Sequence, residues 1–384
     1  MPAISVLAFG MQSIRIFQLV LVIALCSSAL GQLQGTVAGH VYCTDSRTPC
    51  RFAGVVIQTA PELVDGKPAK LSAPWHSYSA ITDIDGAYTI SGVEAGTYYI
   101  IGRLQGYVAP YDLAVNLYAG DPALINQATE IALARVKVDA SRTAVSDLTL
   151  ERGATIGGSL RYDDGSPGIN LPIHFFRKDQ QGSWKPYTNT AGGGTLAPLG
   201  LELHSDDRGE FHEPGLPPGI YAIEATLPQV TFAPSSITGR VSLNLVIANG
   251  SALKIYSGDK LRLPEAVPVI LREGEQKLDL EITIPTRGLH MIHGVVTSLP
   301  EHLLAGGIVS LLDPADKAPL RKADIQSDGS FVMMYVPTGS YLISVEAVPP
   351  RVGAKELSTL LPRVETILVD HDLPNLTYVL SSSK

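Results

Sequence analysis

The sequence predicts an all-β fold built from three tandem β-sandwich domains that follow an N-terminal export signal. Three observations support this prediction: an apolar segment near the N-terminus, a residue pattern that occurs three times, and short alternating segments separated by turn residues. A chain of 384 residues has a length typical of two to four domains. Hydrophobic residues make up 45% and charged residues only 17%, so each domain can bury a core of its own.

Residues 1–31 are predicted to be a signal peptide. Arg15 precedes an apolar stretch at 16–25 that is short for a membrane span. Ala29 and Gly31 then meet the small-x-small rule for cleavage before residue 32. We therefore expect an exported mature chain, located in the periplasm, at the cell surface or in the medium.

Two alternatives to cleavage stay open at this point. An uncleaved anchor is one, and a lipid attached to Cys26 is the other, although Leu25 is larger than the residue that normally precedes a lipidated cysteine. Translation from Met11 instead of Met1 would give a more typical signal peptide. No later segment is apolar enough to predict a membrane span in the mature chain.

The cysteines agree with export. Once the signal is removed, Cys43 and Cys50 are the only two that remain. In an oxidising compartment we expect them to form a disulfide that closes a small loop. The alternative is a metal site with two thiolate ligands, but no second Cys or His pair at ligand spacing accompanies them.

A five-position pattern repeats along the chain. It consists of Gly, an aromatic residue two positions later, an apolar residue at seven, Gly at ten and Tyr at twelve, and it occurs at Gly86–Tyr98, Gly209–Tyr221 and Gly329–Tyr341. The period is about 120 residues, so each repeat is a whole domain rather than one turn of a solenoid.

Two further patterns border each repeat. An apolar-x-Gly-x-apolar segment opens the repeats at 37–41, 156–160 and 292–296. An alternating apolar segment closes them at 148–150, 278–282 and 376–380. The predicted domains are therefore residues 32–151, 152–285 and 286–384.

The repeated glycines indicate turns between strands. Gly86, Gly209 and Gly329 are predicted to lie in tight hairpins that need positive φ, which glycine adopts without strain. A second turn precedes each repeated tyrosine, which then returns to the core. The stretch Pro122–Lys137 is the one place where we expect a helical turn.

These residues resemble the carboxypeptidase regulatory-like domain. The resemblance rests on a Thr-Asp turn ending in Gly and an aromatic residue at 82–88, a Gly-x-Tyr turn at 96–98, and Gly106-Tyr107. The second and third repeats keep related segments at 205–221 and 327–341. The resemblance implies a transthyretin-like, seven-stranded sandwich. Such domains are accessory modules of peptidases, transporters and surface proteins, and they are grouped with carbohydrate-binding-like sandwiches, so the fold leaves the function open.

Asp83 and Asp85 could in principle bind calcium. A loop of the EF-hand type would need a further carboxylate before them and a Glu six residues after the glycine, where the sequence has Ile81 and Gly92. We therefore expect a turn here.

None of the nine histidines falls in a metal-binding pair, so the sequence predicts neither a metal nor a cofactor.

No segment carries the signature of a catalytic site. Ser159 follows two glycines but lacks the x-Gly that completes a nucleophile elbow, and it lies in a predicted opening strand. No HExxH, phosphate-binding loop or dinucleotide-binding pattern occurs. The formal net charge of −8, without a cluster of Lys and Arg, argues against nucleic acid as a partner. We expect a protein without enzymatic activity.

Trp75 and Trp184 are the only tryptophans, and both lie in polar, loop-like surroundings. Exposed aromatic faces stack on sugar rings, so these residues could form a glycan platform. Packing of the two rings against the end of a sandwich is the favoured alternative.

Taken together, these patterns predict an exported, non-enzymatic scaffold or binding protein of the cell envelope or the extracellular space, whose partner is a protein or a glycan. A carbohydrate-binding protein is the alternative. The ligand and the oligomeric state are not encoded in any recognisable pattern.

Overall fold

The computed structural model describes most of the chain after the predicted signal peptide, which lies outside the described residues. The described residues are 34–46, 48–64, 67–68, 75–110, 122–187, 203–237, 240–299, 304, 306–348 and 360–381. The chain divides into two compact units, residues 1–104 with 126–151 and residues 105–125 with 152–384.

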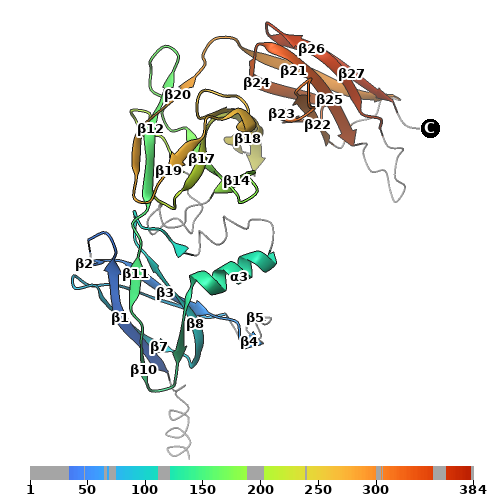
Figure 1. The fold of residues 1–384 in the computed structure, drawn as a ribbon. Coiled ribbons are helices and arrows are strands. Elements are labelled where there is room, and N and C mark those ends of the chain that lie inside the picture. Colours follow the sequence, from blue (N-terminus) through green and yellow to red (C-terminus); the bar gives the residue numbers. More distant parts are fainter. Residues whose placement is uncertain are drawn as a thin grey trace, which may run out of the picture. The chain divides into compact units, whose positions relative to one another are not determined.

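The first unit contains one β-sandwich, here called the first sandwich (residues 35–150; Figure 1, blue to green). In one sheet β1 is central, antiparallel to β7 and to the short β2 and parallel to β10 and β11; the other sheet has the order β6-β3-β8-β9. The strands are β1 (Gly35–Cys43), β2 (Thr48–Pro49), β3 (Gly54–Thr59), β6 (Ser77–Ile81), β7 (Ala87–Val93), β8 (Gly96–Arg103), β9 (Ala134–Val138), β10 (Thr143–Val145) and β11 (Leu148–Leu150), with a separate short pair β4 (Leu63–Val64) and β5 (Lys67–Pro68).

The segment Pro122–Lys137, where the sequence predicts a helical turn, is mostly helix and ends in a strand. Helix α3 covers Pro122–Ala132, and β9 follows at once. Glu130 of the helix accepts hydrogen bonds from the Tyr99 hydroxyl and from Arg135, whose Nε lies 2.9 Å from Oε2. Arg135 also donates to the carbonyl of Pro61 at 2.7 Å. These contacts tie the end of the helix to strands β8 and β9.

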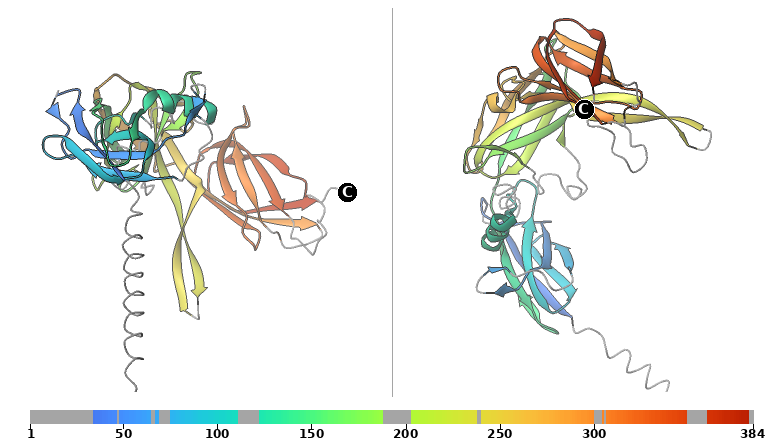
Figure 2. Two further views of the ribbon diagram at one scale, coloured as in Figure 1. Left: turned by 90° about the horizontal axis from the view of Figure 1, so that it is seen from below. Right: turned by 90° about the vertical axis from the view of Figure 1, so that its right-hand side faces the viewer.

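The second unit contains two further pairs of sheets. In the second sandwich (residues 154–284) the sheets have the orders β16-β12-β20 and β14-β13-β17-β18, with β15 and β19 pairing β13 and β17. Strands β17 and β18 continue as a long two-stranded ribbon beyond this sheet (Figure 2, yellow). The strands are β12 (Ala154–Tyr162), β13 (Pro172–Lys178), β14 (Trp184–Tyr187), β15 (Leu203–His204), β16 (Glu210–Leu216), β17 (Gly219–Ile237), β18 (Arg240–Tyr256), β19 (Val269–Leu271) and β20 (Gln276–Ile284), and the 3-10 helix η3 covers Leu263–Glu265.

The described residues of the third sandwich (within 289–381) form seven strands, three in the sheet β24-β21-β27 and four in the sheet β23-β22-β25-β26. As in the other two sandwiches, its first strand is central, with an antiparallel neighbour on one side and a parallel neighbour on the other. The strands are β21 (Leu289–Leu299), β22 (Gly306–Leu312), β23 (Pro319–Asp324), β24 (Ser330–Pro337), β25 (Gly339–Val348), β26 (Arg363–Val369) and β27 (Leu373–Ser381).

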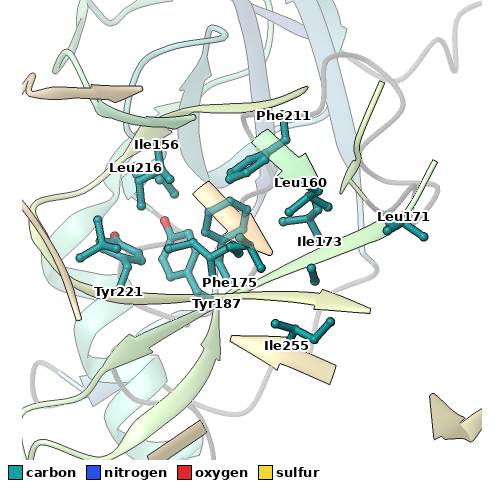
Figure 3. Packing of buried hydrophobic residues seen from close by; sticks show 14 of the residues in the cluster. Ile156, Leu160, Leu171, Ile173, Phe175, Tyr187, Phe211, Leu216, Tyr221 and Ile255 are labelled. Carbon is teal, nitrogen blue, oxygen red and sulfur yellow. The ribbon is translucent and has the colours of Figure 1, made fainter. Parts of the chain in front are cut away.

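Alternating side chains fill the space between the two sheets of each sandwich. In β1, for example, buried residues alternate with more exposed ones along the strand, as the period of two requires. The core of the second sandwich draws on both sheets, with Ile156 and Phe211 from one facing Phe175 and Tyr221 from the other (Figure 3). The all-β sandwich fold expected from the sequence is thus confirmed.

The predicted hairpins at the repeated glycines are a different kind of turn. Strands β6 and β7, on either side of Gly86, belong to different sheets, and the same is true of the strands around Gly209 and Gly329. Each turn is therefore a corner that carries the chain from one sheet to the other. The positive φ is confirmed, at 75°, 76° and 83°. A hairpin and a corner need the same local turn, so sequence alone does not distinguish them.

Each corner is tied to the opening strand of its sandwich. The carbonyl of Gly86 accepts the amide of Val41 at 2.9 Å, and equivalent bonds of 2.7 and 2.8 Å join Leu160 to Gly209 and Val296 to Gly329. A Cβ on Gly209 would lie 2.4 Å from the carbonyl oxygen of Leu160. Close packing therefore requires glycine here as much as the dihedral angle does.

Candidate functional site

The predicted disulfide between Cys43 and Cys50 is present, with the two Cα atoms 5.2 Å apart. It joins the end of β1 to the loop that follows β2. Thr82 supports the same loop, because its hydroxyl donates to the carbonyl of Cys50 at 2.6 Å and accepts the amide of Ala53 at 2.8 Å. The segment between Cys50 and Ala53 is therefore held at both ends.

The Asp83 carboxylate caps the first corner. Its Oδ1 accepts the amides of Asp85 and Ala87, both at 2.9 Å. Asp206 makes the equivalent bonds in the second sandwich, with the amides of Arg208 and Glu210. Within the described parts of the chain, no group of three or more His, Cys, Asp or Glu side chains is placed to hold a metal ion.

The two tryptophans occupy different environments. Trp75 precedes β6 and is 61% exposed. Trp184 begins strand β14 rather than lying in a loop as the sequence indicated, and it is half-buried. The ammonium group of Lys178 lies 4.9 Å from the centre of the Trp184 ring, a cation–π contact that covers part of the ring. Sugar stacking on either tryptophan stays a prediction.

An ionic cluster that the sequence analysis did not identify lies in the second sandwich. It consists of His174 of β13, Glu224 and Thr226 of β17, and Lys254 and Tyr256 of β18. Glu224 is paired with His174 on one side and with Tyr256 on the other, and Thr226 is paired with Lys254. Residues paired across neighbouring strands share a face, so these five side chains converge on the face opposite the core.

Glu224 is the centre of this cluster and is 1% exposed. The Lys254 ammonium lies 3.0 Å from Oε1 and 3.3 Å from Oε2 of its carboxylate. The Thr226 hydroxyl lies 3.1 Å from Oε1, and Nδ1 of His174 lies 3.4 Å from the same oxygen. The buried carboxylate is thus surrounded by donors, as a buried charge must be.

These contacts determine which proton states are populated. Burial by itself would raise the pKa of Glu224, but the donors His174, Lys254 and Tyr256 outweigh it and lower that pKa to about 2. Burial and the neighbouring charge of Glu224 raise the pKa of Tyr256 above its usual range. At neutral pH Glu224 is therefore an anion and Tyr256 is neutral. Neither is poised to exchange a proton, which a general acid or base must do.

An aromatic layer continues the cluster along the same face. The rings of Phe176 and Tyr256 meet edge to face, with centroids 6.2 Å apart. Ala222 and Ala266 are buried beside them, and Trp184 and Leu263 pack against this group. Trp184 therefore contributes to packing, whatever else it contacts.

The opposite sheet of the second sandwich carries a shallow groove of about 640 Å³ on its outer face. Gly157 forms part of its floor, and Ser159, Arg161, His212 and Glu281 are among its lining residues. Side chains of both charges line this groove, which suits it to polar rather than apolar ligands.

The Glu224 cluster could have been suspected from one signal. In the segment Tyr221–Ala225, Glu224 is the only charged residue in a run that otherwise reads as buried strand. Apart from Thr226 on the same strand, its partners come from strands 30 or more residues away, at positions that look like ordinary exposed residues. Without the register of β13, β17 and β18, nothing in the sequence brings them together.

No protein-family profile matches the chain, and no curated protein matches it. Among solved structures, the TIE protein of Bacillus anthracis aligns with 91% of this chain over 51% of its own length, at 10% identity and a TM-score of 0.20. A streptococcal ancillary pilin aligns with 91% of this chain and 99% of its own, at 12% identity and 0.28. The major pilin subunit of Bacillus cereus aligns with 91% and 100%, at 13% identity and 0.22.

This chain spans about half the length of the first of these proteins. With TM-scores this low, the functional proposals below rest on the chain's own residues. Among the described helices, none has both the length and the apolar composition needed to cross a membrane.

Proposed function

We propose that this chain is an exported, non-enzymatic protein of the cell envelope or extracellular space that acts as a scaffold or binding protein. The observation that carries the proposal is the disulfide Cys43–Cys50 in a chain that begins with a signal-like segment. Disulfides persist in oxidising compartments and are rare in the cytosol. The proposal locates the mature chain from residue 32 onward outside the cytoplasm.

The repeated residues support a structural role. The glycines and tyrosines that occur at fixed spacing serve corners and cores, and Asp83 and Asp206 cap two of the corners, so repetition along the chain preserves an architecture. The Glu224 cluster supports the same proposal, because its anionic Glu224 and neutral Tyr256 stabilise one another and are unsuited to proton transfer at neutral pH.

We further propose that the three sandwiches are copies of a carboxypeptidase regulatory-like domain, with limits near residues 151 and 286. In support, the third sandwich has three and four strands in its two sheets, the number that this family implies. The opening strand and the glycine corner are also joined by the same hydrogen bond in all three copies.

Export can be tested directly on the full chain. We expect cell fractionation to recover a chain that starts at residue 32, with Cys43 and Cys50 resistant to alkylation until a reductant is added. A variant that lacks residues 2–31 serves as the control and should remain in the cytosol with both thiols reactive. A full-length chain recovered from the cytosol with reduced cysteines would refute the proposal.

Carbohydrate binding is the second candidate, and the exposure of Trp75 favours it. A tryptophan that is 61% exposed on a sandwich offers a flat apolar face to a sugar ring. A glycan array probed with the purified mature chain should then give signals that Trp75→Ala removes. Trp184→Ala, in which a packed ring is lost, provides the comparison. An array without signals, or with signals unchanged in both variants, excludes this candidate.

A further inference from the structure

Phe52 has a backbone conformation that its side chain does not favour. Its φ is +56°, in the left-handed region that Gly and Asn tolerate and bulky residues avoid. Its side chain is not held by a core, since the residue is 67% exposed. Phe52 therefore meets a conformational penalty without any gain from burial, and such outliers point to function.

The second sandwich contains the same loop, which allows a direct comparison. In the second sandwich the amides of Asn170 and Leu171 bond the carbonyl and hydroxyl of Ser205, as those of Phe52 and Ala53 bond Thr82. Asn170 has φ +55°, nearly the value of Phe52. In the third sandwich the residue at this position is Gly306, whose φ of +143° is positive but lies far from the value of Phe52. The fold thus accepts Asn or Gly here, and only the first sandwich has a large apolar residue.

Two neighbouring positions also carry an exposed apolar residue in the first sandwich alone. Ile81 and Ile84 flank Thr82, the residue to which Phe52 is bonded, and they are 66% and 63% exposed. The residues at these two positions are His204 and Asp207 in the second sandwich and Asp324 and Ser327 in the third. All four are exposed and polar. The exposed apolar cluster of Phe52, Ile81 and Ile84 is therefore specific to the first sandwich and is not required by the shared fold.

The loop that presents Phe52 is held firmly. The disulfide fixes Cys50, the Thr82 hydroxyl bonds both Cys50 and Ala53, and Nε of Arg51 donates to the carbonyl of Ile84 at 2.9 Å. A rigid aromatic residue that is already placed for contact loses little entropy on binding. Aromatic side chains ringed by smaller apolar contacts are typical centres of protein interfaces.

The charges around this cluster indicate what covers it. Ile84 lies between the exposed carboxylates of Asp83 and Asp85, and Asp45 is exposed in the β1–β2 turn. Arg51 is the one cation among the described residues of these two loops, and the sequence adds Arg47, so the acidic residues outnumber the basic ones by three to two. An acidic rim opposes docking on an anionic lipid surface and on a second copy of a chain whose net charge is −8. It favours a partner with basic side chains.

We propose that Phe52, Ile81 and Ile84 form a docking surface for a partner protein that presents an apolar pocket bordered by Lys or Arg. This inference deepens the proposed function, on which it rests, because it gives the exported chain a specific binding surface. Phe52 would enter the pocket, and Ile81 and Ile84 would exclude water around it.

The test places a photo-cross-linking phenylalanine analogue at position 52 of the full chain in its native host, with the same analogue at Asn170 as the matched control. We expect one discrete protein adduct from position 52 and none from position 170. The adduct should disappear with Ile84→Asp and weaken severalfold in 0.5 M NaCl, and the captured protein should present an apolar surface bordered by basic residues. Equal adducts at both positions, an adduct to lipid, a dimer of this chain, or no adduct would overturn the proposal.

Two controls separate the possible failures. Phe52→Asn should leave the midpoint of urea unfolding unchanged or raised, because Asn occupies this position in the second sandwich; a lowered midpoint would mean that Phe52 serves the fold, which contradicts the proposal. Fractionation of the same cells reports export independently. A chain that is exported but not cross-linked refutes only the docking surface, whereas a chain retained in the cytosol refutes the proposed function.

Discussion

At the scale of single residues, Tyr98, Tyr221 and Tyr341 make one contact three times. The hydroxyl of each donates to the carbonyl oxygen four residues earlier, at 2.9, 2.7 and 2.8 Å. The ring enters the core while the hydroxyl closes the turn that precedes it, an arrangement related to the tyrosine corner of other β-sandwiches. The repeated tyrosine is thus explained by two separate physical requirements, apolar packing and the pairing of a backbone carbonyl.

Replacing Tyr221 by Phe tests the second requirement alone. Tyr221 is fully buried, so Tyr221→Phe leaves the carbonyl of Pro217 without its partner and without access to water. We expect a loss of about 1–3 kcal/mol in the free energy of unfolding, measured by urea denaturation. Tyr341→Phe, at a half-buried tyrosine, should lose less because water can replace the hydroxyl. Equal stability of Tyr221→Phe and the parent chain would contradict this account.

The Glu224 cluster predicts a specific dependence of stability on pH. The pKa of Glu224 falls from an ordinary 4.5 to about 2 on folding. Its stabilising contribution is therefore complete above about pH 4.5 and is lost as the pH falls towards 2. A shift of this size corresponds to roughly 3 kcal/mol. The difference in unfolding free energy between the parent and Glu224→Gln should shrink over this range. A difference for Glu224→Gln that does not change with pH would disprove the assignment.

At the scale of elements, the central opening strand of each sandwich carries a glycine where the parallel closing strand approaches most closely. A Cβ on Gly39 would lie 2.0 Å from the carbonyl oxygen of Ser146, between β10 and β11. The equivalent distances are 2.0 Å from Gly158 to Leu280 and 2.7 Å from Gly294 to Leu376. In the second and third sandwiches the register of the closing strand shifts at this glycine. The glycine of the opening pattern therefore makes room for an irregularity in the neighbouring strand.

Gly39→Ala should separate β1 from the closing strands. A methyl group cannot occupy a position 2.0 Å from a carbonyl oxygen, so the pair must move apart. We expect a loss of at least about 2 kcal/mol in unfolding free energy, by analogy with overpacked cores. Gly54→Ala in β3 is the matched control, because its Cβ would lie 3.7 Å from the nearest atom and its φ is not positive. Similar losses for the two variants would show that close approach is not the reason for Gly39.

At the scale of the whole molecule, one arrangement of strands occurs three times with different additions. In the first sandwich helix α3 is inserted after β8, the strand that carries the repeated Tyr98, and before β9 of the same sheet. In the second sandwich the β17–β18 ribbon follows the part of β17 that carries Tyr221. The insertions occur at the same point of the topology. The strands that the three sandwiches share supply most of each core, and in the second sandwich Leu253 and Ile255 of β18 add to it.

Residues 152–285 should fold when expressed alone. Every buried member of the main core of the second sandwich lies between Ala154 and Ile284, so no such residue is supplied from outside the predicted limits. We expect a single cooperative urea transition by circular dichroism, with a midpoint close to that of the corresponding transition in the mature chain. A segment ending at residue 270 lacks β20 and should not fold. A non-cooperative transition for 152–285 would place the domain limits elsewhere.

Much of this architecture could be predicted because it is local in sequence. The five-position pattern carries the corner, the following turn and the tyrosine within thirteen residues, and the positive φ of Gly86 follows from the same local constraint. Sequence reasoning failed where partners are distant. It described the corners as hairpins because the strand after each corner pairs with a distant opening strand, as β7 does with β1, and not with the strand before the corner. It overlooked Glu224 because His174 and Lys254 approach it only through strand register.

The sequence by itself determined that the chain is all-β, that one pattern of turn and core residues recurs three times and that Cys43 pairs with Cys50. Each of these depends on residue types at fixed separations, which turn geometry and strand alternation translate directly into structure. Only the tertiary structure decided which strands share a sheet, that Trp184 is packed while Trp75 is exposed, and that Phe52, Ile81 and Ile84 are all exposed. The reason is physical: burial and neighbourhood are set by contacts between segments far apart in the chain, and a linear pattern does not specify those contacts.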